Sequence, residues 1–150
     1  MTIQDSPMIQ IDEPRLDLLP ECDVHQEETV CTHVWELLST LYPKDDILER
    51  RRENRYPFPH LIHLTPVADD GKTPQGKSIV VVGKHLSQRG LGFYHPTPLP
   101  YRRMIASLQC NGHWLGFLID LKWCRFTKQG WYESGGRFIQ AVPSPIKNTD

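Results

Sequence analysis

The 150-residue chain has no apolar run long enough to form a membrane helix, and its N-terminus has no basic segment followed by an apolar one. A membrane-spanning helix needs about 20 consecutive apolar residues, and the best candidate, residues 114–119, is short and contains a glycine. We therefore expect a cytoplasmic protein with no membrane partner. The four cysteines have no C-x-x-C spacing, so we expect them to be reduced thiols.

Sequence motifs of enzymes are also missing. The chain contains no G-x-S-x-G, no H-E-x-x-H and no Walker-type phosphate loop. Cys22, His25, Cys31 and His33 match no common structural zinc pattern, and the last two would lie on different faces of a helix. We therefore expect a protein that is not an enzyme and that holds neither a cofactor nor a metal.

Charge is distributed unevenly along the chain. Residues 1–30 carry a net charge of −7, and residues 31–150 carry a net charge of +6. Three prolines and weak periodicity predict a disordered acidic leader over residues 1–22. The rest is not basic enough for a long nucleic-acid track, so no DNA or RNA partner is expected. A small ligand that carries two phosphates fits this charge better.

Residues 23–43 are predicted to form one amphipathic helix. Asp23 and Gln26 make a plausible N-terminal capping pair, and Pro43 supplies the stop. Apolar side chains recur at helical spacing on one stripe, which consists of Val30, Val34, Leu37, Leu38 and Leu41. A single helix cannot bury such a stripe alone. Residues 24–42 must therefore pack on the rest of the protein or on a partner, either an unknown downstream protein or a second copy.

Residues 57–143 show the pattern of an all-β domain. An arginine-rich linker over residues 44–56 precedes this domain, and a tail over residues 144–150 follows it. Asn111-Gly112 is a strong tight-turn signal. The predicted strands are residues 60–67, 77–84, 91–95, 103–110, 114–126 and 131–142. Six short strands separated by turns predict a small six-stranded antiparallel β-barrel.

The strand over residues 114–126 has the clearest alternation of apolar and polar residues. We expect its alternate side chains to face the core, namely Leu115, Phe117, Ile119, Leu121 and Trp123. The order slips at Cys124-Arg125, where a β-bulge is expected. We interpret Trp123 and Trp131 as aromatic residues of the core or the barrel end rather than as surfaces that stack on nucleobases.

Two polar segments stand out against this pattern. Residues 49–55 hold four arginines, and residues 85–90 form a polar turn between two apolar runs. The planar guanidinium of arginine suits phosphates and flat aromatic faces, and a serine near a glycine offers a hydroxyl and close access to the backbone. We expect the two segments to converge on one compact anionic nucleotide. The alternative is a solvated basic patch beside an ordinary turn.

The spacing within these segments resembles the PilZ domain family. Arg51-x-x-x-Arg55, extended by Arg50, precedes His85-x-Ser87-x-x-Gly90, where the family has D/N-x-S-x-x-G. Three further segments resemble the end of that domain, namely Trp123-x-Arg125, Gly130-x-Tyr132 and Gly135-Gly136-Arg137-Phe138. The similarity covers about residues 49–142. It implies a PilZ-like barrel and a signalling receptor or adaptor that changes conformation when it binds cyclic di-GMP.

The resemblance also implies the ligand contacts. Arg50, Arg51 and Arg55 are expected at phosphate and guanine, whereas Arg52 points elsewhere in an extended segment. Ser87 is expected to donate its hydroxyl to the ligand, and Gly90 to allow close packing.

Three further residues complete the expected site. Gly135 and Arg137 mark a close approach to ligand or backbone, or a barrel corner. His85 replaces the family's Asp or Asn and cannot offer carboxylate acceptors. It either takes over their role, weakens binding, or marks a degenerate protein-interaction module that binds no nucleotide.

Overall fold

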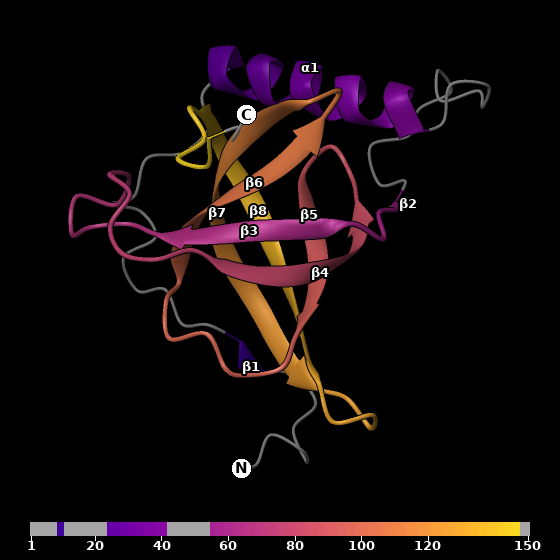
Figure 1. The fold of residues 1–150 in the computed structure, drawn as a ribbon, viewed down its shortest axis with the longest axis vertical. Coiled ribbons are helices and arrows are strands. Elements are labelled where there is room, and N and C mark those ends of the chain that lie inside the picture. The colour runs from indigo at the N-terminus through magenta and orange to yellow at the C-terminus, as the bar shows by residue number, and fades with distance from the viewer. Residues whose placement is uncertain (1–8, 11–23, 42–54, 148–150) are drawn as a thin grey trace.

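The computed structural model of the protein describes residues 9–10, 24–41 and 55–147. In chain order the elements are β1 (Ile9–Gln10), α1 (Val24–Leu41), β2 (Tyr56–Pro57), β3 (Leu61–Pro66), β4 (Ile79–Leu86), β5 (Gly90–His95), β6 (Arg103–Cys110), β7 (His113–Phe126) and β8 (Tyr132–Val142). Strands β3 to β8 pair antiparallel in the order β7-β6-β3-β4-β5-β8, and pairing of β7 with β8 closes the ring. The described residues therefore form a closed six-stranded barrel with one helix, as the sequence predicts (Figure 1).

Short turns set the register of neighbouring strands. Asn111 and Gly112 have φ angles of 53° and 81°, and they connect β6 to β7 as a two-residue hairpin loop. Such a loop needs positive φ at both positions, which asparagine and glycine tolerate best. The predicted tight turn is confirmed, and it places Cys110 opposite His113.

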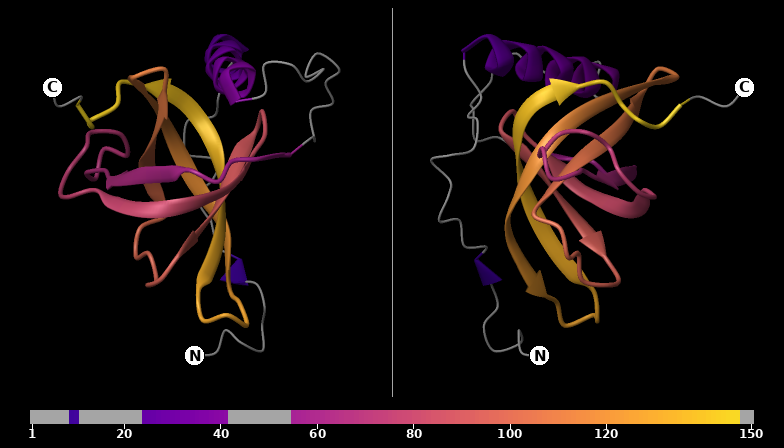
Figure 2. Two further views of the ribbon diagram at one scale, coloured as in Figure 1. Left: turned by 45° about the vertical axis from the view of Figure 1, so that its right-hand side comes forward. Right: turned by 90° about the vertical axis from the view of Figure 1, so that its left-hand side faces the viewer.

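The helix α1 lies across one end of the barrel and shares its core (Figures 1 and 2). The buried residues of its stripe are Val30, Val34, Leu37 and Leu38, and they belong to the same cluster as the inward-facing side chains of the strands. The apolar stripe predicted from the sequence therefore packs on the barrel. No helix of the described residues is long and apolar enough to cross a membrane.

Two short strands lie outside the closed ring. β2 pairs with β4, so that Tyr56 faces Leu86 and Pro57 faces His85. β1 pairs with the part of β7 that extends beyond β6. The sequence predicts a disordered leader over residues 1–22, whereas residues 9–10 form a short strand here, because the open edge of β7 can bind an extended backbone. The other leader residues, and residues 42–54, lie outside the described residues.

Two details of the strands differ from the sequence prediction. β4 continues to Leu86, so His85 lies on a strand between Pro57 and Gly92 rather than in the turn. Pairing with β2 provides backbone partners there that a turn would lack. The register of β7 with β8 shifts between Leu121 and Trp123, rather than at Cys124-Arg125, where the sequence predicts a bulge.

Candidate functional site

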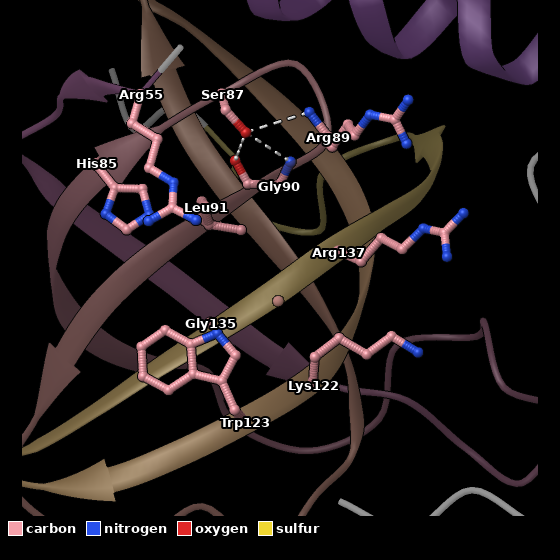
Figure 3. A pocket seen from close by; sticks show the side chains of 11 residues that line it. Arg55, His85, Ser87, Arg89, Gly90, Leu91, Lys122, Trp123, Gly135 and Arg137 are labelled. Atoms are coloured by element: carbon pink, nitrogen blue, oxygen red, sulfur yellow. Dashed lines mark hydrogen bonds between the residues drawn. The ribbon is translucent and has the colours of Figure 1, made fainter. Parts of the chain in front are cut away.

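A cavity of about 250 Å³ lies where β2, β4, β5, β7 and β8 meet (Figure 3). Its lining residues are Arg55, His85, Ser87, Arg89, Gly90, Leu91, Lys122, Trp123, Gly135, Gly136 and Arg137. Six of these were predicted from the sequence as site residues, namely Arg55, His85, Ser87, Gly90, Gly135 and Arg137. The structure therefore brings Arg55 of the first motif together with the second motif. Arg50 and Arg51 lie outside the described residues.

Strand pairing explains why residues so far apart in sequence converge. Pairing of β2 with β4 ends one residue after Arg55 and holds that arginine beside the turn formed by residues 87–90. On the other side, β5 pairs with β8 so that Gly90 faces Arg137. One side of the cavity is thus formed by a sheet that also carries the barrel core.

Ser87 shapes the turn that borders the cavity. Its backbone N–H donates to the Gly90 carbonyl oxygen at 2.9 Å. Its hydroxyl oxygen accepts from the backbone N–H groups of Arg89 and Gly90, both at 3.3 Å, and the hydroxyl donates to the Gly90 carbonyl oxygen at 3.3 Å. The resemblance to the PilZ motif predicts that this hydroxyl donates to the ligand, whereas here its bonds lie within its own turn (Figure 3).

Gly90 is required by the close approach of β8. A Cβ atom at this position would lie 2.1 Å from the carbonyl oxygen of Gly136, which is backbone and cannot move aside easily. This is the close packing that the sequence predicts for Gly90. It lets the turn sit directly against β8, so that Arg89 and Arg137 are both present at the cavity (Figure 3).

The cavity has a cationic lining. It includes Arg55, Arg89, Lys122 and Arg137 and no carboxylate. Lys122 Nζ lies 3.3 Å from Asp120 Oδ2. Within the described residues, the three arginines make no ion pair with an acidic side chain. A concave surface with charge of one sign concentrates ions of the other sign, so the cavity favours an anionic ligand.

His85 supplies a neutral group to this cationic surface. Burial is the main cause that lowers the pKa of its imidazole below the usual 6.5, and the positive charges of Arg55 and Lys84 lower it further against the opposing effect of Glu133. At pH 7 the ring is therefore neutral. A neutral imidazole offers one hydrogen-bond donor and one acceptor, which suits the polar edge of a planar base.

Three cationic or aromatic side chains that line the cavity were not predicted as site residues from the sequence. Arg89 lies between Ser87 and Gly90, so the S-x-x-G motif could have identified it as a residue beside the site. Lys122 and Trp123 reach the cavity through the register shift in β7. Trp123 was expected to face the core, but its side chain is half-buried and lines the cavity, so that prediction is wrong.

A second and larger cavity, of about 530 Å³, lies near the end of α1. Its lining has histidines and apolar side chains but no lysine or arginine. It is therefore less suited to an anionic ligand than the cationic cavity. No group of three or more His, Cys, Asp or Glu side chains among the described residues could hold a metal ion.

Comparisons of the chain with protein-family models, with curated proteins and with solved structures found no match. Function is therefore inferred from the residues of the site and from their arrangement.

Proposed function

We propose that this protein is a receptor for cyclic di-GMP and binds it at the cationic cavity. The observation that carries the proposal is the pairing of β2 with β4, which holds Arg55 beside the His85-x-Ser87-x-x-Gly90 segment. Cyclic di-GMP presents two phosphates and two guanines. Arginine pairs with phosphate oxygens and with the O6/N7 edge of guanine, so one residue type serves both halves of the ligand.

The size of the cavity indicates how the ligand sits. Cavities that enclose a small molecule usually measure about 300–1,000 Å³, and this one measures about 250 Å³. A dinucleotide therefore binds with one part in the cavity and the rest over its rim. Arg50 and Arg51 precede Arg55 in the same motif and are the proposed contacts for that exposed part.

Signalling follows from the connection between Arg55 and α1. The linker that carries Arg50 and Arg51 joins α1 to β2, so an anion that binds these arginines favours one position of the linker. A response that exposes the apolar stripe of α1 must release residues such as Leu37 and Leu38 from the barrel core, where both are buried. The ligand shifts that equilibrium only as far as it binds one state more tightly than the other.

The test is isothermal titration calorimetry with cyclic di-GMP, and with GTP as the competing nucleotide. We expect micromolar or tighter binding, about −8 kcal/mol, that Arg51→Ala and Arg55→Ala each weaken at least tenfold. Lys77→Ala is the matched control, because Lys77 is an exposed cation outside the cavity. Absence of heat with the wild-type protein, or equal affinity for GTP, would contradict the proposal.

A second candidate function is a protein-interaction module that keeps the barrel and binds no nucleotide. It is favoured by His85, which stands where the related motif has Asp or Asn, and by the Ser87 hydroxyl, whose bonds lie within its turn. This candidate predicts no nucleotide heat, together with a stable dimer or a protein partner.

A further inference from the structure

Four residues from four strands form one row on the outer surface of the barrel. Trp123 of β7 faces Gly135 of β8, Gly135 faces Gly92 of β5, and Gly92 faces His85 of β4. Residues that face each other on antiparallel strands project from the same side of the sheet. Trp123 and His85 therefore stand at the two ends of a row whose middle is formed by two glycines.

Both rings lie down over these glycines. A Cβ atom on Gly135 would lie 2.3 Å from Nε1 of the Trp123 indole, and one on Gly92 would lie 2.4 Å from Cε1 of the His85 imidazole. Each ring thus occupies the space that a side chain at the glycine would otherwise fill. The two glycines lie on the neighbouring strands β8 and β5. The two rings, which we call the Trp123–His85 platform, both lie at the cavity that they line (Figure 3).

The register shift in β7 turns Trp123 outward. Leu121 faces Gly136 and is buried in the core. Strict alternation would send Trp123 into the core as well, but Lys122 is the extra residue of a bulge, and Trp123 faces Gly135. A bulge disrupts the ladder locally and often re-aims a side chain beside a functional site. Here it exposes an indole in a cationic cavity.

We propose that the Trp123 indole, at one end of the Trp123–His85 platform, stacks against a purine base of the ligand. The inference rests on the proposed function and assigns the base to this row. Arg137 lies two residues after Gly135 on the same face of β8, opposite Gly90. We therefore expect the phosphate to bind at Arg137, beside the row that holds the base. Base stacking on an aromatic side chain is tolerant of the base, and guanine specificity then comes from Arg55 at the polar edge.

The experiment measures binding of cyclic di-GMP, GMP and ribose 5-phosphate to the wild-type protein, Trp123→Leu, Trp123→Phe and Trp131→Leu. Losing one stacked base weakens binding by about tenfold to a hundredfold. We expect that loss in Trp123→Leu, a smaller loss in Trp123→Phe, and none in Trp131→Leu, whose tryptophan is exposed outside the cavity. GMP should bind the wild type more tightly than ribose 5-phosphate, which has the phosphate without the base.

Fluorescence gives a second readout, because a stacked base lies directly against the indole. A stacked purine should quench the indole emission of the wild type and of Trp131→Leu, but the quenching should disappear in Trp123→Leu. If cyclic di-GMP binds the wild type and Trp123→Leu equally, the platform is wrong and the receptor proposal survives. If GMP alone binds, with quenching, the platform stands and the dinucleotide is the wrong ligand. If no nucleotide binds, both proposals fall.

Discussion

Arg55 lies close enough to His85 for its positive charge to help lower the pKa of the imidazole, second only to burial as a cause. The pairing of Pro57 with His85 holds this arrangement through the backbone. Arg55 of the first motif and His85 of the second motif are thus electrostatically coupled without a ligand. Substitution of His85 should therefore change how firmly Arg55 is held.

The first prediction concerns His85→Asp. A carboxylate at this position can pair with the Arg55 guanidinium and fix its orientation, which a neutral imidazole cannot do. We expect cyclic di-GMP affinity to rise by about tenfold, equivalent to about 1.4 kcal/mol, in calorimetric titration. His60→Asp, at an exposed histidine outside the cavity, is the control. Binding that appears only in His85→Asp would identify the natural chain as the interaction module.

The second prediction concerns the contact between the turn and β8. Gly90→Ala should lower the free energy of unfolding by about 2 kcal/mol or more, because the new methyl group meets the Gly136 carbonyl oxygen. Gly136→Ala is the matched control. Its Cβ would lie 3.2 Å from Ile119 Cδ1, the end of a flexible side chain, so a cost below about 1 kcal/mol is expected. Urea unfolding of both variants gives the comparison, and equal costs would contradict the packing.

The third prediction concerns the docking of α1. Leu38 is fully buried, so Leu38→Ala should lower the free energy of unfolding by about 2–5 kcal/mol. Ser39→Ala changes the exposed next residue and should stay within about 0.5 kcal/mol. Chemical denaturation followed by circular dichroism checks both values. A cost below about 1 kcal/mol for Leu38→Ala would mean that the helix does not share the barrel core in solution.

The fourth prediction is a pH dependence that Glu133 causes. Burial alone would raise the pKa of this carboxyl, but hydrogen bonds from Lys84 and Arg125 outweigh burial, so the pKa in the folded protein lies below the usual 4.5. The resulting stability is present above pH 4.5 and is lost as the pH falls through the folded-state pKa. Glu133→Gln should therefore flatten this acid limb in unfolding experiments.

The same variant should also be less stable at neutral pH. Glu133 is buried, whereas the side chains of Lys84 and Arg125 are 36% and 44% exposed. Removing the carboxylate leaves two partly hydrated cations, so the expected cost is about 1–3 kcal/mol at pH 7 rather than the larger cost of a fully buried pair. An unchanged acid limb in Glu133→Gln would show that other carboxylates control it.

The fold could be predicted from the sequence because its signals are local. Alternating apolar residues place Phe117, Ile119 and Leu121 in the core, and Asn111-Gly112 sets a hairpin loop. The stripe of α1 is also a local pattern, and its burial on the barrel follows from the need to cover it. These features require only the periodicity of one element at a time.

The composition of the site could be predicted only in part. The motifs identify Arg55, Ser87 and Gly90, but Lys122 and Trp123 reach the cavity through one extra residue in β7. Alternation predicts the bulge at Cys124-Arg125, after Trp123 rather than before it, because the position of the bulge depends on pairing with β8, a strand formed later in the chain. His85 was placed in the turn for a related reason, since its strand position depends on β2.

The thiol of Cys110 lies 3.5 Å from the Thr40 hydroxyl oxygen and 3.9 Å from the Glu36 carbonyl oxygen, so α1 covers it. Attack by a thiol-specific reagent is thereby blocked for as long as the helix stays on the barrel. The rate at which Cys110 is labelled therefore measures how often α1 leaves the barrel. A change in that rate when cyclic di-GMP is added would show that ligand binding and release of the helix are linked.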